Sequence, residues 1–519
     1  MTGKVYLIGA GPGDPGLITC KAVACLSQCN VIIYDYLASP ALLSIASKQA
    51  EYIYVGKKGG DHTMKQDQIN QLIVDKALAG QVVCRLKGGD PYIFGRGGEE
   101  AEILNQNNIP FEVIPGITSG IAAPAYAGIP LTHRKMTSTL AFVTGHEDPT
   151  KSESSIYWPS LAKGIGTLVF YMGVKQLPGI VEQLIKHGKS KETPVALVRW
   201  GTTSRQQTVT GKLDNIVEIV QKSGLRAPAI IVVGEVVSLR DKLGWFEQKP
   251  LFGKTIVVTR ARRQASDLVR QLTDLGAECI ECPTIEIVPP DDDQPMRQAI
   301  QKISNYDWLV FTSVNGVLKF FNLLFDMGKD VRALGHIKIC TIGPVTASQL
   351  MAYGLKTDIL PETYRAESVV KAFEKINIRD KRVLLPRAKE ARTVLPESLR
   401  KIGAIVDEVI AYQTISVTGH DPEIISRIQN ADIHMITFTS SSTVNNFCNI
   451  FPDCISNENF NKKVIMASIG PITSETARKQ GLSVSIEAEE YTIPGLTKAI
   501  VDFFYSDEVT NKSPLHDSL

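Results

Sequence analysis

The segment that decides the fold of the first half is Val5-Tyr-Leu-Ile-Gly-Ala-Gly-Pro-Gly-Asp-Pro-Gly16. A short apolar run followed at once by closely spaced glycines is typical of a buried strand that ends in a tight loop. Further apolar runs of strand length lie at 31–34, 82–86, 140–144, 168–172 and 230–233. A helical spacing of apolar residues over 66–79 separates two of these runs. This alternation predicts an α/β fold with parallel sheet.

The glycine-rich loop at 11–16 has the spacing Gly-x-Gly-x-x-Gly, and Asp35 stands where a ribose-binding carboxylate would be expected. A nicotinamide-dependent oxidoreductase is therefore one alternative. Dinucleotide loops, however, hold pyrophosphate through backbone N–H groups. Because Pro12 and Pro15 each remove one such donor, this loop is better suited to packing against a ligand than to binding phosphate.

The chain changes character near residue 250, where 244–250 combine polar residues with a glycine and a proline. The β-branched run within 254–260 then predicts the first strand of a new domain. We therefore expect domains at 1–245 and 251–505, followed by a polar C-terminal tail at 506–519.

The second half contains an internal repeat at a constant offset of 127 residues. Thr312-Ser313 corresponds to Thr439-Ser440, and Ile342-Gly-Pro-Val-Thr346 corresponds to Ile469-Gly-Pro-Ile-Thr473. Such a repeat predicts two similar α/β lobes with a ligand cleft between them, or alternatively a duplication without a site. The repeated hydroxyl groups follow apolar strands, where α/β sheets usually bind ligands, which favours a site.

The composition is that of an ordinary globular protein, with 44% hydrophobic and 21% charged residues and a net charge of +2. This charge gives no general attraction to nucleic acid or membranes, so we expect neither as a partner. The sequence shows no signal peptide, no membrane-spanning run and no metal-ligand set. The nine scattered cysteines argue against a disulfide framework, and a cytoplasmic location is expected.

Several motifs of the first half occur together in one known family. They are Gly9-Ala-Gly-Pro-Gly-Asp-Pro15, Val55-Gly-Lys57, Arg85-Leu-Lys-Gly-Gly-Asp-Pro-Tyr-Ile-Phe-Gly-Arg-Gly-Gly-Glu-Glu100, Pro115-Gly-Ile-Thr118, Gly128-Ile-Pro-Leu-Thr-His-Arg134, Tyr171-Met-Gly173 and Pro228-Ala-Ile-Ile-Val-Val-Gly-Glu235. In this order they resemble the uroporphyrinogen-III C-methyltransferases, which are S-adenosylmethionine-dependent tetrapyrrole methylases. The resemblance implies two α/β domains with the cofactor in the cleft between them.

The resemblance also implies which residues bind S-adenosyl-L-methionine and its product S-adenosyl-L-homocysteine. These are Pro12, Gly88, Gly89, Asp90, Ile93, Thr118, Ser119, Met172 and Gly201. Adjacent glycines would allow the backbone to approach the cofactor, Asp90 would accept hydrogen bonds from its ribose or aminoacyl group, and Met172 would pack on its adenine. Considered alone, Met172 would be interpreted as core filling.

The family's acid–base pair falls on Asp35 and Lys57. Methyl transfer to a pyrrole carbon depends on alignment, and the ring must then lose a proton, for which a carboxylate is a natural base. Without the resemblance, Asp35 would be a strand-end cap and Lys57 a surface charge. Arg96 and Arg134 are expected to bind carboxylates of the substrate.

The second half resembles uroporphyrinogen-III synthase through Val258-Thr-Arg260, Phe311-Thr-Ser-Val-Asn-Gly-Val317, Pro361-Glu-Thr-Tyr-Arg-Ala-Glu367, Ala411-Tyr-Gln-Thr414 and Phe438-Thr-Ser-Ser-Ser-Thr443. That family has two flavodoxin-like lobes and closes hydroxymethylbilane into a ring. The resemblance implies that Tyr412 protonates the departing hydroxyl, although a strand-end tyrosine is the alternative. Carboxylate-binding hydroxyls are expected at Thr312, Ser313, Thr346, Thr439, Ser440 and Thr473. Ile472 departs from the family pattern, so its side chain cannot make a hydroxyl contact.

Together the resemblances imply an α/β protein with a two-domain tetrapyrrole methylase fold followed by a two-lobed synthase fold. The function expected is bifunctional: hydroxymethylbilane is cyclised to uroporphyrinogen III, which is methylated twice to precorrin-2. The alternative is an active methyltransferase with a C-terminal tetrapyrrole-binding module that lacks synthase activity. The resemblance also implies a homodimer through the methyltransferase half and leaves open whether sirohaem or cobalamin is the end product.

Overall fold

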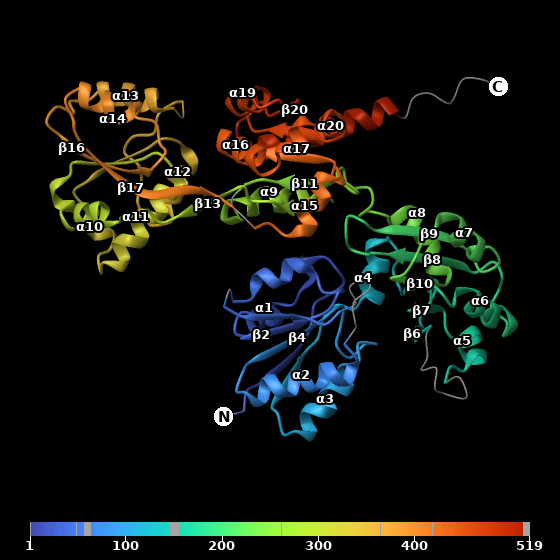
Figure 1. Cartoon of the computed structure of the whole chain (residues 1–519). Coiled ribbons are helices and arrows are strands. Elements are labelled where there is room, and N and C mark those ends of the chain that lie inside the picture. Colours follow the sequence, from blue (N-terminus) through green and yellow to red (C-terminus); the bar gives the residue numbers. More distant parts are fainter. Residues whose placement is uncertain are drawn as a thin grey trace, which may run out of the picture. The chain divides into compact units, whose positions relative to one another are not determined.

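The structure is a computed structural model that describes residues 2–47, 49–56, 64–145, 155–260, 262–363, 365–417 and 419–511 (Figure 1). It forms two compact units, the first built mainly from Met1–Ile256 and the second mainly from Ile280–Ile500. Lys57 lies outside the described residues, so the structure gives no account of that predicted site residue.

The first unit begins with a five-stranded, fully parallel sheet of order β3-β2-β4-β1-β5. Its strands are β1 (Val5–Gly9), β2 (Val31–Tyr34), β3 (Glu51–Tyr54), β4 (Val83–Lys87) and β5 (Phe111–Ile114). Helix α1 (Cys20–Leu26) shares a core with one face, and α2 (Gln66–Leu78) and α3 (Gly97–Gln106) share a core with the other. The chain leaves β1 towards β2, passing β4, and leaves β4 towards β5, passing β1. The loops after these neighbouring strands therefore cross in opposite directions at the carboxyl end of the sheet, which is where such sheets bind ligands.

The second sheet of this unit has the order β6-β7-β10-β8-β9 and is mixed. Its strands are β6 (Leu140–Thr144), β7 (Thr167–Tyr171), β8 (Pro194–Arg199), β9 (Gln207–Lys212) and β10 (Ala229–Val233). Only β6 and β7 pair in parallel; the other three pairings are antiparallel. The expectation of parallel sheet is therefore correct for the first sheet and wrong for the second. Residues 200–206 join β8 to β9 as a hairpin, and β10 lies antiparallel between β7 and β8. The helices are α4 (Ser119–Tyr126), α5 (Trp158–Gly164), α6 (Leu177–Lys186), α7 (Ile216–Ser223) and α8 (Arg240–Leu243).

The segment after α8, predicted as a linker, is anchored on the first unit by aromatic contacts. The ring of Tyr126 lies 5.0 Å from Trp245 and 4.7 Å from Phe246. The indole nitrogen of Trp245 also donates to the carbonyl of Ala125 at 3.1 Å. The chain therefore leaves the first domain through a packed segment.

The remaining strands form two further five-stranded sheets. One has the order β12-β11-β18-β19-β20, with strands β11 (Thr255–Val258), β12 (Glu278–Glu281), β18 (Met435–Phe438), β19 (Ile465–Ser468) and β20 (Val484–Glu487). The other has the order β13-β17-β16-β14-β15, with strands β13 (Ile285–Val288), β14 (Trp308–Phe311), β15 (Lys338–Thr341), β16 (Arg382–Ala388) and β17 (Ile405–Ser416). The first lobe thus takes its strands from both sides of the second lobe in sequence, so the lobes do not coincide with the two copies of the repeat.

The helices of these lobes follow the strands in the usual α/β alternation. They are α9 (Arg262–Asp274), α10 (Gln294–Gln301), α11 (Val314–Asp326), α12 (Pro344–Met351), α13 (Ala366–Glu374), α14 (Val394–Lys401), α15 (Pro422–Gln429), α16 (Ser441–Ile450), α17 (Pro452–Ser456), α18 (Glu458–Lys463), α19 (Pro471–Lys479) and α20 (Ile493–Asn511). Helix α20 continues past 505, where the sequence predicts a polar tail.

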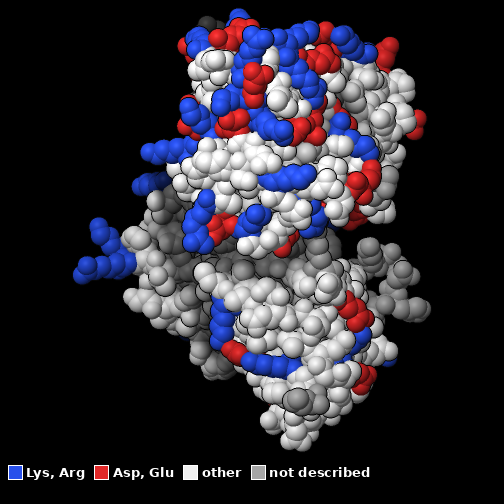
Figure 2. Space-filling view, turned by 90° about the vertical axis from the view of Figure 1, so that its left-hand side faces the viewer, with Lys and Arg blue, Asp and Glu red and all other residues white. Residues whose placement is uncertain are grey.

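All nine cysteines are free thiols in the structure. Within the described part of the chain, no helix is both long and apolar enough to cross a membrane. On the face shown in Figure 2, Lys and Arg lie interspersed with Asp and Glu, in keeping with the net charge of +2.

Candidate functional site

The loops that follow β1 and β4 are held together backbone to backbone. The Gly89 amide donates to the Gly11 carbonyl at 2.7 Å, and the Gly11 amide donates to the Gly89 carbonyl at 3.2 Å. A Cβ on Gly116, in the loop after β5, would lie 2.3 Å from the Gly89 carbonyl oxygen and 2.7 Å from Cα of Gly9. Only glycine permits three chain segments to approach so closely.

Asp90 ties these loops together through its carboxylate. One oxygen accepts from the amides of Tyr92 (2.8 Å) and Ile93 (3.2 Å), and the other accepts from the amide of Gly116 (3.0 Å). Both oxygens therefore already have backbone partners. The role that the structure describes for Asp90 is to shape the loop, while its contact with a cofactor stays a prediction.

Tyr171, at the end of β7, joins the second sheet to α4. Its hydroxyl lies 2.8 Å from that of Thr118 and accepts from the Gly120 amide at 3.1 Å. The neighbouring Met172 has a left-handed backbone (φ 54°) and a 54% exposed side chain. Met172 therefore does not fill the core, and it directly follows Tyr171, which contacts Thr118 and Gly120.

The loop after β8 meets the loop after β1. The Asp14 amide donates to the Thr202 hydroxyl at 3.0 Å, and a Cβ on Gly13 would lie 3.4 Å from the carbonyl oxygen of Gly201. Non-glycine residues with left-handed backbone gather in these loops, at Phe94, Arg96, Met172, Trp200 and Thr202. Such strained residues concentrate at functional sites. The structure thus brings together the segments that contain Pro12, Gly88 to Ile93, Thr118–Ser119, Met172 and Gly201.

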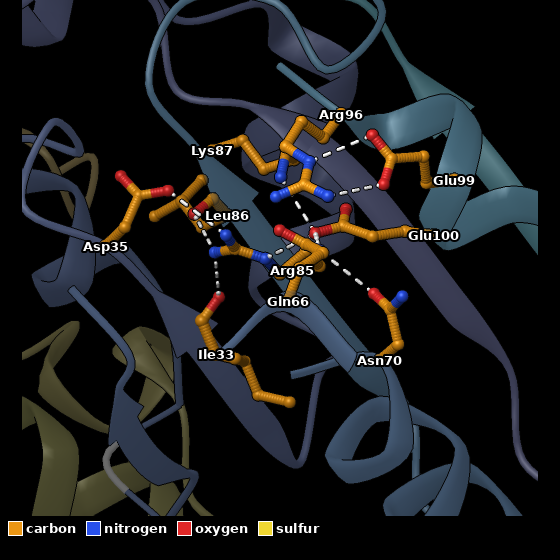
Figure 3. Close-up of polar contacts among 10 residues, drawn as sticks. All are labelled: Ile33, Asp35, Gln66, Asn70, Arg85, Leu86, Lys87, Arg96, Glu99 and Glu100. Atoms are coloured by element: carbon orange, nitrogen blue, oxygen red, sulfur yellow. Dashed lines mark hydrogen bonds and ion pairs between the residues drawn. The ribbon is translucent and has the colours of Figure 1, made fainter. Parts of the chain in front are cut away.

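A buried network of charges lies beside these loops, beneath Asp35 at the end of β2 (Figure 3). Arg85 Nη2 donates to Asp35 Oδ2 at 3.2 Å, and its Nε donates to Glu100 Oε1 at 3.1 Å. Lys87 Nζ donates to the same Glu100 oxygen at 2.8 Å. The pKa of Lys87 is lowered, first by burial and then by the positive charge of Arg85. Two cations thus balance two carboxylates within one cluster.

The two arginines predicted to bind substrate are both exposed. Arg96 precedes α3 and forms two hydrogen bonds with Glu99, at 2.9 and 2.6 Å. Arg134 lies in the loop before β6. Each is accessible to an anionic ligand, although Arg96 would exchange Glu99 for a ligand carboxylate.

In the second unit, the structure brings together two of the predicted site residues, Tyr412 and Ser313. The Tyr412 hydroxyl on β17 lies 3.0 Å from that of Ser313, which caps α11 by accepting from the Gly316 amide at 3.0 Å. Tyr412 is only 7% exposed. Its hydroxyl is therefore held at the end of a buried ring rather than on a mobile side chain.

The internal repeat has a structural counterpart at four helix N-termini. Ser313 caps α11 and Ser440 caps α16, each just after a strand, with Thr312 and Thr439 preceding them. Thr346 and Thr473 occupy the first turns of α12 and α19 and are each 5% exposed. Helix N-termini present free N–H groups to anions, so these positions suit carboxylates. Ile472 is 55% exposed and offers no hydroxyl.

Glu100 is a buried charged residue that no sequence pattern had singled out. Its signal was present, because Arg85 and Lys87 alternate along one strand and so point to the same face of the sheet. Two buried cations on one face require a counter-charge, and the glutamates that follow the glycine-rich loop were the nearest source.

Comparison with known proteins gives matches to both halves of the chain. The family model for tetrapyrrole (corrin/porphyrin) methylases matches residues 4–217, and that for uroporphyrinogen-III synthase HemD matches 266–498. Porphyrin biosynthesis protein HemD of Ruminiclostridium josui is 38% identical over 96% of this chain and 98% of its own length. Uroporphyrinogen-III C-methyltransferase of Priestia megaterium is 56% identical over 46% of this chain and 99% of its own length. A solved uroporphyrin-III C-methyltransferase from Thermus thermophilus, complexed with S-adenyl homocysteine, is 38% identical, with a TM-score of 0.40 over 46% of this chain and all of its own.

Proposed function

Since the chain belongs to the tetrapyrrole methylases through its first half and to the uroporphyrinogen-III synthases through its second, we propose that it catalyses two consecutive reactions. The second half cyclises hydroxymethylbilane to uroporphyrinogen III. The first half methylates uroporphyrinogen III twice, using S-adenosyl-L-methionine, to give precorrin-2. The observation that carries the proposal is the 38% identity to a porphyrin biosynthesis protein over 96% of the chain, which spans both halves.

The residues of the first site fit a methyl-donor cofactor. The glycine contacts leave backbone rather than side chains at the ends of β1 and β4, and Met172 offers an exposed, adaptable apolar side chain. Pro12, Gly88, Gly89, Asp90, Ile93, Thr118, Ser119, Met172 and Gly201 would hold S-adenosyl-L-methionine, which supplies an electrophilic methyl group when bound.

We assign Asp35 as the base that accepts the proton lost by the macrocycle after methylation, from a pyrrole N–H or a bridging CH2 group. Its carboxylate is 25% exposed and is fixed by Arg85 on one oxygen and by the Leu37 amide, at 3.1 Å, on the other. A fixed, accessible carboxylate is suited to general-base catalysis. Arg96 and Arg134 would bind the substrate's carboxylates, and Lys57 remains its proposed acid–base partner.

In the second half, Tyr412 would donate its proton to the departing hydroxyl of the bilane. The contact between Tyr412 and Ser313 orients that hydroxyl. Thr312, Thr346, Thr439, Ser440 and Thr473, together with the helix N-termini, would bind the acetate and propionate groups. The protein then mainly has to hold the chain in a closing conformation and exclude water.

The two activities are tested separately on the full chain. When hydroxymethylbilane is supplied alone, the protein should produce uroporphyrinogen III. Formation of uroporphyrinogen I, the product of spontaneous closure, would show that the second half is a binding module without synthase activity. Uroporphyrinogen III with S-adenosyl-L-methionine should gain two methyl groups by mass. We also propose a cytoplasmic homodimer formed through the methyltransferase half; a monomeric mass in light scattering would contradict the dimer.

A further inference from the structure

Glu100 on α3 is connected to Asp35 by the side chain of Arg85 (Figure 3). The two remaining acceptors of Arg85 are backbone carbonyls, those of Leu86 at 3.1 Å and Ile33 at 3.4 Å. The donors of a guanidinium lie in one plane and keep fixed relative directions. The contact of Arg85 Nε with Glu100 therefore also fixes the direction of Arg85 Nη2, which donates to Asp35.

Glu100 is a buried carboxylate that accepts hydrogen bonds from three side chains. Its side chain is 0% exposed, and Oε1 accepts from Arg85, from Lys87 and, at 3.2 Å, from Gln66 Nε2. Burial of a carboxylate is costly, and well-packed apolar side chains often stabilise a fold as well as a buried ion pair does. A buried Glu100 is therefore poorly explained by stability alone.

The cluster has one member that a substrate can reach. The side chains of Arg85, Lys87 and Glu100 are 4%, 6% and 0% exposed, whereas that of Asp35 is 25% exposed. Three buried groups thus support one accessible carboxylate. Such an arrangement is typical of a positioned base.

We propose that Glu100 is a positioning residue for methyl transfer: it fixes Arg85, and Arg85 orients the Asp35 carboxylate. Every pyrrole carbon of uroporphyrinogen III carries a substituent, so the methylated carbon has no hydrogen to lose. The proton that Asp35 accepts leaves a pyrrole N–H or a neighbouring bridging CH2 group, and the electrons of the broken bond neutralise the cationic ring. This inference rests on the proposed function, and specifically on Asp35 as the base.

A double-mutant cycle tests whether Glu100 acts through Asp35. Glu100→Gln should lower kcat for methylation by up to about 100-fold, because small displacements of a reacting group have effects of that size, with a smaller change in KM. Asp35→Asn should lower kcat by about 100-fold or more. In the Asp35→Asn background, Glu100→Gln should add little further loss. Glu102→Gln, on the exposed side of the same helix, should leave kcat unchanged.

Ring closure by the second half of the same molecule reports that each variant is intact. Lys87→Met with Glu100→Gln removes one charge of each sign, so this pair should fold even if Glu100→Gln alone does not, and it should show the same loss of kcat. If Glu100→Gln lowers kcat by the same factor in the wild-type and Asp35→Asn backgrounds, the inference is wrong. Full methylation activity of Glu100→Gln, or of Lys87→Met with Glu100→Gln, would also overturn it. Either result would leave the proposed function intact. Full activity of Asp35→Asn would remove both the inference and the base assignment, and a wild-type chain that does not methylate would remove the proposed function itself.

Discussion

The two candidate sites hold their functional groups by different means. In the methyltransferase half, the accessible Asp35 carboxylate pairs with Arg85, which belongs to a buried network of ion pairs. Glycine contacts shape the neighbouring loops. In the synthase half, neutral hydroxyls cap helices at the ends of strands, and a buried tyrosine contacts one of them. The difference fits the proposed chemistry: one half would accept a proton from its methylated substrate, whereas the other would bind a flexible polyanion whose own hydroxyl departs.

Outside the Asp35 network, the largest expected effect concerns Tyr412. Tyr412→Phe should lower kcat for ring closure by about 100-fold, since it removes the proton donor, and should leave methylation of supplied uroporphyrinogen III unchanged. Tyr306→Phe is a matched control in the same lobe, because its hydroxyl donates to Asp407 at 2.8 Å instead. A Tyr412→Phe variant with normal ring closure would show that this tyrosine merely caps a strand end.

A second prediction tests the glycine contacts of the methyltransferase half. Gly116→Ala should weaken S-adenosyl-L-methionine binding by about 10- to 100-fold in calorimetry, because overpacking costs about 1–3 kcal/mol. The physical reason is a new Cβ only 2.3 Å from the Gly89 carbonyl oxygen. Gly98→Ala is the control, since a Cβ there meets nothing within 4 Å. If Gly116→Ala binds S-adenosyl-L-methionine with unchanged affinity, the loop after β5 does not shape the cofactor site.

A smaller effect is expected for Tyr126, which links the anchored segment after α8 to the loop after β1. Its hydroxyl donates to Asp14 Oδ2 at 2.7 Å. Tyr126→Phe removes this hydrogen bond and should weaken cofactor binding by about fivefold, corresponding to about 1 kcal/mol. The synthase rate measured in the same preparation should not change; if it fell too, the effect would be general destabilisation.

The smallest effect lies away from both sites and depends on pH. Salt bridges from Lys21 and Lys4 lower the pKa of Glu112 on β5 from 4.5 to about 2. A carboxyl whose pKa is lower in the folded state stabilises the fold above its unfolded pKa, and this contribution is lost as the pH falls from about 4.5 towards 2. Glu112→Gln should therefore melt slightly below wild type at pH 7, and the difference should shrink at pH 3. Because Glu112 and its two lysine partners are accessible to solvent, the difference in melting temperature at pH 7 is small. A difference that grows on acidification would contradict this account.

The sequence predicted the elements that carry long apolar runs, such as β2 and β6, with their correct bounds. It missed β9, whose residues Gln207-Thr-Val-Thr-Gly-Lys212 are mostly polar because the strand lies at the edge of its sheet. The antiparallel pairing of β8 and β10 was also missed, since pairing is a non-local property that periodicity does not encode.

The sequence predicted the loops of the candidate site but did not predict the buried carboxylate of Glu100 beside them. The glycine motifs indicated the segments around Gly11 and Gly89, which the structure brings into contact. Glu100 was missed because a glutamate on a helix is normally a solvent-exposed residue, and only the folded chain shows its 0% exposed side chain against Arg85. The repeat, in contrast, located Ser313 and Ser440 at equivalent helix caps, because it encodes the same strand–helix junction twice.

One reaction tests the central claim, that a single chain performs both steps. The full-length protein is incubated with hydroxymethylbilane and S-adenosyl-L-methionine carrying a labelled methyl group, and the product is identified by absorbance, mass and isomer type. We expect a type-III macrocycle with two labelled methyl groups. A type-I macrocycle, or a type-III macrocycle without label, would contradict this claim by showing that one half is inactive.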